Sequence, residues 1–225
     1  MVNIKQAISD FEKKFNSTLE KTNRKKSSVQ VVAVTKNRSI QETKEIIQGG
    51  FFHLAENRSE GLLEKQKELS VYDITWHFIG NLQTRKVKEI INRIDYLHSL
   101  DRLSLAKEIE KRAQDSVRCF VQVNVSGEDT KSGIAPEKLE EFILELATFS
   151  KIKVVGLMTM APKNSNEEVI RLIFSKLKNY QKQIERKKIP HAPCTELSMG
   201  MSGDYQVAIE EGATYIRIGS LFFQE

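Results

Sequence analysis

The sequence contains few cysteines and no long apolar segment. Its 225 residues include two cysteines, Cys119 and Cys194, which cannot by themselves form a disulfide framework or a zinc site, and no metal site is expected. No apolar run approaches the roughly 20 residues of a membrane helix, and residues 1–6 lack the apolar core of a secretory signal. Reduced, structural thiols in a chain without such a signal predict a cytoplasmic protein with no membrane partner.

Nucleic-acid-binding motifs are also missing, although the chain is basic. The formal net charge is +5, from 35 Lys and Arg against 30 Asp and Glu, and clusters of basic residues lie in residues 1–26 and 182–188. A basic protein suggests a nucleic-acid partner, but the sequence has no RNP-type aromatic motif, zinc-finger spacing or clear recognition helix. We interpret the basic stretches as solvated helix faces and expect no nucleic-acid partner.

What the chain does contain is an ordinary globular composition, with 40% hydrophobic and 29% charged residues, which argues against a disordered or collagen-like protein. Short apolar runs recur along it, each nearly continuous in hydrophobicity, as in parallel strands that are covered on both sides. The predicted strands are residues 29–34, 51–54, 75–79, 96–100, 118–125, 154–160, 195–199 and 215–218.

Amphipathic segments fill most of the gaps between these runs. The predicted helices are residues 4–22, 39–48, 60–69, 102–114, 136–148, 167–186 and 202–211. Alternating strands and helices predict an α/β fold, and the number of repeats fits a compact (β/α)8 TIM-type barrel. We predict one domain over residues 1–225, with the extra N-terminal helix closing the outer ring. The alternative is an open doubly wound sheet, but no GxGxxG follows the first strand.

In such a barrel, functional residues lie at the C-terminal ends of the strands. This rule selects candidate residues at the end of every predicted strand, many of them polar residues or glycines. They are Thr35 and Lys36, Glu56 and Asn57, Gly80 to Gln83, Ser99 and Asp101, Asn124 and Ser126, Met158 and Thr159, Ser198 to Gly203, and Arg217, Gly219 and Ser220.

Lys36 ends the apolar segment VVAVTK. A lysine in that position is expected to be partly desolvated, which lowers the pKa of its amine and frees the amine for Schiff-base chemistry. The alternative is a lysine that merely extends its charge to the mouth of the barrel.

The segment SMGMSG (198–203) and the strand end Arg217-Ile218-Gly219-Ser220 point to an anion site. Glycines let the backbone approach a ligand, and hydroxyls and free N–H groups hold an anion. Either segment alone could be a helix cap or a tight turn. Together, after the seventh and eighth strands, they favour a phosphate site. A phosphate cradle that faces a strand-end lysine is the arrangement expected for pyridoxal 5′-phosphate (PLP).

The sequence resembles the PLP homeostasis protein family, whose fold is similar to the N-terminal barrel of alanine racemase. The resemblance covers nearly the whole chain, in order. The matching stretches are residues 31–40 (VVAVTKNRSI), 53–65, 74–88, 97–109, 121–134, 156–162 and 196–223.

The resemblance implies a role for each matched position. Lys36 matches the lysine that forms the internal aldimine, Asn57 an asparagine close to the cofactor ring, and Arg217 the arginine that faces the pyridine nitrogen. The phosphate contacts are matched by Ser198, Gly219 and Ser220, with the backbone of Gly200 to Ser202 alongside. His77 and Met158 are expected to line the same mouth. Apart from the resemblance, Lys131 lies in the turn after the fifth predicted strand, on the same face of the barrel, and could steer or hold phosphate, although a solvated loop lysine is the simpler interpretation.

The family pattern is not kept everywhere. Ala55 replaces the glycine usual before Glu-Asn, Thr35 a common serine, and Ser220 a frequent threonine, and the usual Gly-Xaa-Arg ending is missing. None of these differences removes a type of cofactor contact.

Arg217 also bears on catalysis. A guanidinium can only donate, so it pairs with an unprotonated pyridine nitrogen and leaves the ring a weaker electron sink than a carboxylate partner would. The alternative is a strand-end arginine paired with a carboxylate.

Racemisation needs a base on each face of the substrate carbon. In alanine racemase the second base is a tyrosine brought from a separate C-terminal domain of the partner chain, and this sequence ends at Glu225, directly after the eighth predicted strand. The resemblance therefore implies a PLP carrier with little or no catalysis that takes part in vitamin B6 homeostasis and hands PLP to apoenzymes. We expect a monomer rather than a dimer. The alternatives are a PLP-dependent amino-acid racemase of low activity or decarboxylase, and a barrel that binds phosphosugar or nucleic acid.

Overall fold

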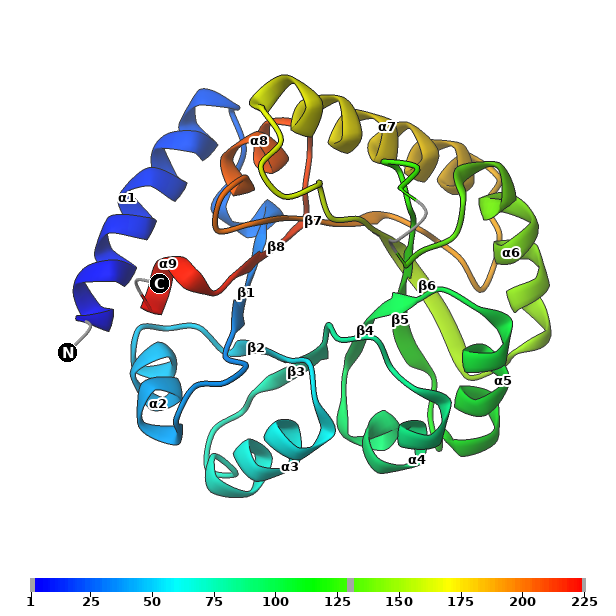
Figure 1. Cartoon of the computed structure of the whole chain (residues 1–225), viewed down its shortest axis with the longest axis horizontal. Coiled ribbons are helices and arrows are strands. Elements are labelled where there is room, and N and C mark those ends of the chain that lie inside the picture. Colours follow the sequence, from blue (N-terminus) through cyan, green and yellow to red (C-terminus); the bar gives the residue numbers. More distant parts are fainter. Residues whose placement is uncertain (1–2, 129–131, 224–225) are drawn as a thin grey trace.

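The computed structural model describes residues 3–128 and 132–223, and its centre is a closed sheet of parallel strands (Figure 1). Within these residues the strands are β1 (Gln30–Val34), β2 (His53–Glu56), β3 (Thr75–Phe78), β4 (Tyr96–Leu100), β5 (Val117–Gln122), β6 (Ile152–Met158), β7 (Glu196–Met201) and β8 (Tyr215–Ile218). Each strand pairs with the next, and β8 closes the barrel on β1 through Ala33 and Ile218. The predicted (β/α)8 barrel is confirmed, and the open sheet is wrong.

Helices surround the barrel. They are α1 (Ile4–Lys21), α2 (Ile40–Gln48), α3 (Ser59–Glu68), α4 (Val87–Ile90), α5 (Leu103–Arg112), α6 (Leu139–Glu145), α7 (Glu167–Arg186), α8 (Tyr205–Glu210) and α9 (Ser220–Phe223). The sequence analysis missed α4 and α9, because four residues are too few to show a helical period. It also began α8 three residues early, since β7 continues to Met201 and Asp204 is the N-cap.

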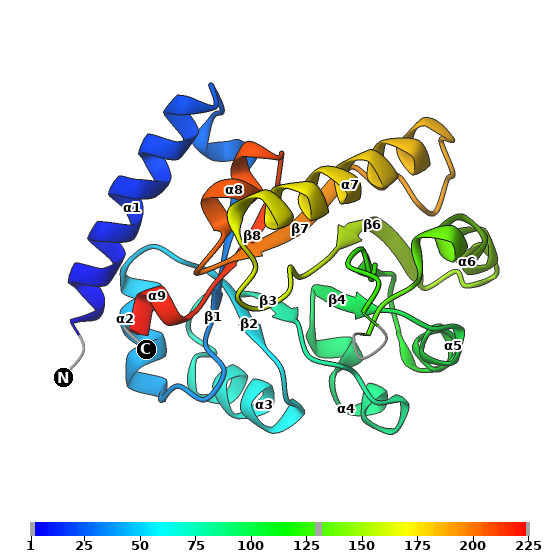
Figure 2. The same ribbon diagram turned by 45° about the horizontal axis from the view of Figure 1, so that its top comes forward.

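The N-terminal helix closes the outer ring, as predicted. α1 lies beside α2, α8 and α9 in both views of the molecule (Figures 1 and 2). Its apolar face includes Phe11, whose ring centroid lies 5.3 Å from that of Tyr205 in α8 and 5.1 Å from that of Phe222 in α9. α9 is a single turn, and α1 packs against it and against the neighbouring helices α2 and α8.

The side chains of β1 alternate between two environments. Val32 and Val34 belong to a small cluster inside the barrel, whereas Val31 and Ala33 join the larger core between the sheet and the helices. Side chains in a strand alternate with a period of two. Lys36 lies two residues beyond Val34, in the turn that follows β1 at the C-terminal end of the barrel.

Both cysteines are free and buried, in agreement with the prediction of structural thiols. Burial raises the pKa of each thiol to about 12, so Cys119 and Cys194 are unreactive in the folded protein. Among the described residues, no helix combines the length and the apolar character needed to cross a bilayer.

Candidate functional site

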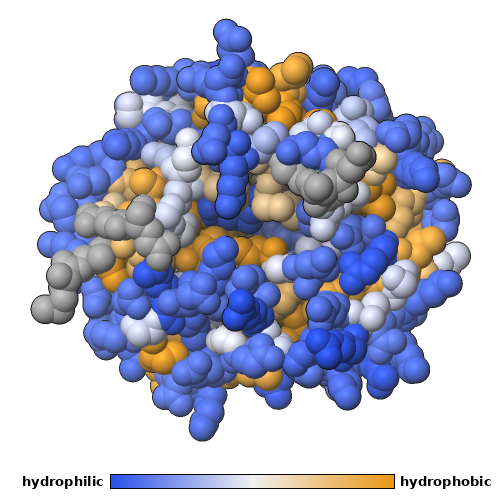
Figure 3. Space-filling model, in the orientation of Figure 1, coloured by the Kyte–Doolittle hydropathy of each residue, from blue (hydrophilic) through white to orange (hydrophobic). Residues whose placement is uncertain are grey.

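A cavity of about 470 Å³ opens at the C-terminal ends of the strands. We call it the mouth cavity. Its lining includes Lys36, Asn81, Thr159 and Lys163. The face of the molecule that Figure 3 presents is largely hydrophilic, with scattered apolar patches and a hollow near its centre. A cavity in this position, lined by apolar residues together with polar ones such as Lys36 and Thr159, fits the predicted location of the site.

Lys36 borders the mouth cavity, but its side chain is exposed. The expected desolvation of the amine is therefore wrong for this structure, because Lys36 lies beyond the last residue of β1. The predicted position at the mouth is correct. An exposed amine is free to meet a ligand that enters the cavity.

A buried network holds the backbone just before Lys36. The Nζ atom of Lys65 in α3 lies 2.6 Å from Oε1 of Glu56 and 2.8 Å from the carbonyl oxygen of Thr35, to both of which it donates. The Thr35 hydroxyl donates to the same Glu56 oxygen over 2.7 Å. The sequence analysis missed this network. Its signal is Lys65, three residues after the fully buried Leu62, on the inner face of a helix.

A candidate anion site, which we call the anion cradle, lies where β7 and β8 end. The hydroxyl oxygen of Ser202 accepts hydrogen bonds from the backbone N–H groups of Gly219 and Leu221, each over 3.2 Å. A Cβ atom built on Gly219 would lie 3.3 Å from Cβ of Val34, so the cradle sits beside the end of β1. Ser220, the first residue of α9, is exposed. The sequence predicted this segment, but it assigned only a backbone role to Ser202.

Ser198 and Gly200 have other surroundings. Ser198 is fully buried, and its hydroxyl contacts Arg217 and His98, not the cradle. Gly200 has a φ of 91°, and a Cβ built there would lie 2.5 Å from Cβ of Ala208 in α8. A glycine is therefore required at position 200 by the backbone and by the close approach of β7 to α8.

Arg217 lies beneath the mouth cavity. Its Nη1 atom donates to Ser198 over 2.6 Å, and its Nη2 atom donates to the carbonyl oxygen of Thr159 over 3.1 Å. Thr159 also borders the mouth cavity. Burial lowers the pKa of Arg217 to about 10, against the opposing charge of Asp204. No ion pair involves Arg217 within the described part of the chain, so the carboxylate-paired arginine finds no support.

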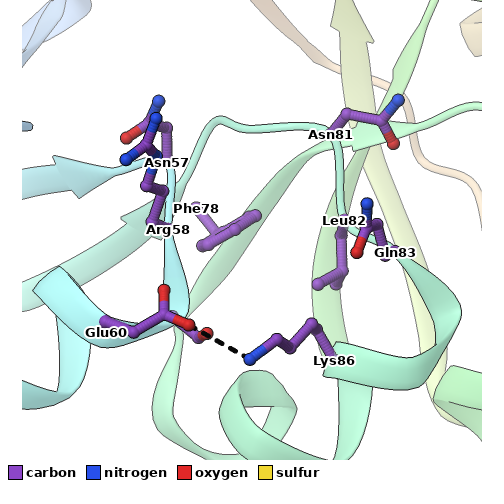
Figure 4. A pocket seen from close by; sticks show the side chains of 9 residues that line it. Asn57, Arg58, Glu60, Phe78, Asn81, Leu82, Gln83 and Lys86 are labelled. Atoms are coloured by element: carbon purple, nitrogen blue, oxygen red, sulfur yellow. Dashed lines mark hydrogen bonds and ion pairs between the residues drawn. The ribbon is translucent and has the colours of Figure 1, made fainter.

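Asn57 borders a second cavity, between the loops that follow β2 and β3 (Figure 4). Asn57 and Arg58 lie on one side of it, Asn81 lies on the other, and Lys86 reaches across to Glu60 over 3.1 Å. Asn81 borders both this cavity and the mouth cavity. The structure therefore brings Asn57 next to the mouth cavity but not into its lining.

Two residues expected at the mouth lie deeper. His77 is fully buried between two other histidines, and Met158 packs against the interior cluster that contains Tyr96 and Phe120. Both point into the barrel because strand side chains of this parity face its interior. Lys131 lies outside the described residues.

Comparisons with known proteins agree with this fold. Residues 14–225 match the family model of the alanine racemase N-terminal domain. The chain is 38% identical to the pyridoxal phosphate homeostasis protein of Aquifex aeolicus over 100% of this chain and 99% of that one. A protein of Bifidobacterium adolescentis, described as unknown, has a TM-score of 0.93 and 32% identity, covering 98% and 94% of the chains.

A further solved structure is PipY of Synechococcus elongatus with PLP bound. It has a TM-score of 0.84 and 28% identity, and the match covers 98% of this chain and all of PipY. The barrel, the family model and the full-length relatives lead to one assignment. The chain belongs to the pyridoxal phosphate homeostasis protein family, which shares the fold of the N-terminal domain of alanine racemase.

Proposed function

We propose that this chain binds PLP in the mouth cavity and takes part in PLP homeostasis in the cytoplasm, with little or no catalysis of its own. The observation that carries the proposal is the anion cradle beside the end of β1. Two backbone N–H groups converge there on the Ser202 hydroxyl, and the exposed amine of Lys36 follows the neighbouring strand. The relatives named for PLP homeostasis, and PipY with its bound PLP, support the same ligand.

The residues present fit PLP at three points. When bound, PLP supplies an electrophilic aldehyde carbon, an anionic phosphate and a pyridine nitrogen. We assign the aldehyde carbon to Lys36 and the phosphate to the cradle, with Gly219, Ser220 and the backbone around Gly200 in its wall. The N–H groups of Gly219 and Leu221 can turn from the Ser202 oxygen to a phosphate oxygen, to which the Ser202 hydroxyl also donates.

Arg217 limits what the site can do with the ligand. It is buried, and it can only donate hydrogen bonds. A guanidinium at this point keeps the pyridine nitrogen unprotonated, which weakens the ring as an electron sink. We assign the pyridine nitrogen to Arg217, place Asn57 at the edge of the site, and assign no catalytic residue.

The partners follow from the same assignment. A chain that holds PLP without consuming it can pass PLP to PLP-dependent apoenzymes, and we propose these as its partners. We further propose that the barrel acts as one domain and as a monomer. The exposed Lys36 supports exchange of the ligand, since nothing in the described residues covers its side chain.

The test is to add PLP to the purified protein, reduce any Schiff base with borohydride and locate the adduct by peptide mapping. We expect an absorbance band in the visible range after PLP is added, its loss on borohydride reduction, and a reduced adduct that peptide mapping places on Lys36. Absence of a band would contradict the proposal and favour another phosphorylated ligand. Fast racemisation of added amino acids that depends on Lys36 would favour the racemase.

Replacing Ser202 with alanine tests the phosphate cradle. Hydrogen bonds to charged groups contribute about 1.5–3 kcal/mol each, so we expect PLP affinity to fall about 10- to 100-fold. Affinity for pyridoxal, which has the aldehyde but no phosphate, should stay unchanged. The measurement is a titration of the Ser202→Ala variant with PLP and, separately, with pyridoxal, which gives the affinity for each ligand. An equal loss for both ligands would show that Ser202 supports the fold of the site and not the phosphate.

A further inference from the structure

Polar side chains cross the interior of the barrel in one continuous hydrogen-bonded series. Nδ1 of His53 lies 2.9 Å from Nε2 of His77, and Nδ1 of His77 lies 2.8 Å from Nε2 of His98. Nδ1 of His98 lies 2.8 Å from the Ser198 hydroxyl, which also accepts from Arg217 over 2.6 Å. We call these five residues the interior chain. It runs from the N-terminal end of β2 to Arg217 beneath the mouth cavity.

The direction of the hydrogen bonds follows from Arg217. A guanidinium cannot accept, so the Ser198 oxygen accepts from it and the Ser198 proton must find another partner. Within the described residues that partner is Nδ1 of His98. The opposite arrangement would leave a buried hydroxyl proton unpaired, which is costly.

Each histidine of the interior chain then has the same tautomer. If Nδ1 of His98 accepts, its proton is on Nε2, which donates to His77. The same reasoning gives an Nε2–H tautomer at His77, which donates to His53. Burial lowers the pKa of both His77 and His98 well below the ordinary value, in agreement with neutral rings. Among the described residues, these rings do not form a group suited to hold a metal ion.

Aromatic neighbours fix the orientation of the two buried rings. The His77 ring stacks on Tyr96, with centroids 4.6 Å apart and an interplanar angle of 4°. The His98 ring stacks on Phe120 at 4.5 Å. An imidazole ring whose orientation is fixed by stacking can also fix the orientation of a hydroxyl group to which it is hydrogen-bonded, here that of Ser198. Sequence analysis placed each histidine in a predicted strand but gave no reason to connect them.

We propose that His98, supported by His77, is a positioning residue that acts through Ser198 to orient Arg217 toward the ligand. The His98 ring holds the Ser198 hydroxyl so that its oxygen faces Nη1 of Arg217, while the Thr159 carbonyl holds Nη2. The guanidinium plane is thereby fixed beneath the mouth cavity. This role rests on the proposed function, because the group that Arg217 meets is the pyridine nitrogen of PLP.

The first experiment reads the tautomers in the protein without PLP. Nitrogen-15 NMR of the histidine rings should show His77 and His98 as neutral Nε2–H tautomers, and Ser198→Ala should change the Nδ1 signal of His98. A charged ring or an Nδ1–H tautomer at His98 would overturn the direction of the interior chain. This measurement does not depend on PLP binding.

The second experiment is a double-mutant cycle on the PLP dissociation constant. We expect His98→Leu to weaken PLP binding about tenfold in the wild-type background and to have no further effect in Arg217→Met, because His98 acts through Arg217. His98→Asn should restore much of the affinity, since its amide oxygen can accept from Ser198. His191→Leu, which removes a histidine outside the interior chain, should leave the PLP dissociation constant unchanged.

The outcomes separate the proposed role of His98 from the proposed binding of PLP by the chain. His98 would be a general structural residue if His98→Leu caused the same loss of PLP affinity in the wild-type and Arg217→Met backgrounds. Equal effects of His98→Leu and His98→Asn on PLP affinity would lead to the same conclusion. If His98→Leu does not fold, Ser198→Ala takes its place in the cycle. If the wild type takes up no PLP, the proposed function fails and the cofactor role of His98 fails with it, while the NMR spectra still decide the direction of the interior chain.

Discussion

Replacing Lys36 with alanine is expected to abolish the borohydride-fixed PLP adduct, whereas replacing Lys163 with alanine leaves the adduct at the wild-type level. Both amines border the mouth cavity and both are exposed, so exposure does not distinguish them. Their positions do distinguish them: Lys36 lies in the turn directly after β1, and the end of β1 lies beside the anion cradle through Val34 and Gly219. The measurement is the mass of the reduced protein and of its peptides.

The Lys36→Ala variant should still bind PLP without a covalent bond. The cradle and Arg217 remain, and hydrogen bonds to a charged phosphate contribute about 1.5–3 kcal/mol each. Equilibrium dialysis should therefore detect weaker, reversible binding that adds no mass after borohydride. An adduct that persists in Lys36→Ala, or one that disappears in Lys163→Ala, would show that another lysine holds the aldehyde.

Much of the barrel could be predicted because its signals are local. The predicted helix over 167–186 and the predicted strands over 96–100 and 215–218 have the observed bounds. Each is a run long or apolar enough for its period to be recognised. The order of these elements then limits the topology, since parallel strands with helical crossovers wind in one hand. The same reasoning places Lys36 at the mouth.

The site was harder to predict, because it depends on register and on distant pairs. Ser198 and Ser202 occur in one motif, and a regular strand would place both on the same face. The register of β7 on β8 shifts between Ser198 and Met201, where Gly200 has its positive φ. Ser198 therefore points into the barrel, and Ser202 reaches the cradle. Sequence alone does not reveal such a shift.

The buried network around Lys65 also depends on contacts between residues that are distant in the sequence. Glu56, Lys65 and Thr35 come from three elements, and nothing in the local pattern shows that they meet. Their close contact depends on how α3 packs against β1 and β2. The contribution of this network to the free energy of unfolding therefore has to be measured, and replacing Lys65 provides the test.

Lys65→Met should destabilise the protein by about 3–5 kcal/mol, because it leaves the Glu56 carboxylate buried without its cation. The side chains of Lys65 and Glu56 are only 5% and 2% exposed. Lys187→Met is the matched control: its ion pair with Glu140 is almost as short, at 2.7 Å, but exposed at 42% and 53%, and such pairs contribute about 0–1 kcal/mol. Urea unfolding measures both free energies.

A double variant separates stability from the position of Lys36. Glu56→Leu combined with Lys65→Met removes both charges, and stability should largely recover, since a well-packed apolar pair can replace a buried ion pair. In this double variant the Thr35 carbonyl oxygen still lacks the Lys65 donor and keeps only the hydrogen bond from the Arg38 N–H. We therefore expect the yield of the PLP adduct to stay below wild type even when the free energy of unfolding returns. Full recovery of both would show that Lys65 stabilises the barrel without positioning Lys36.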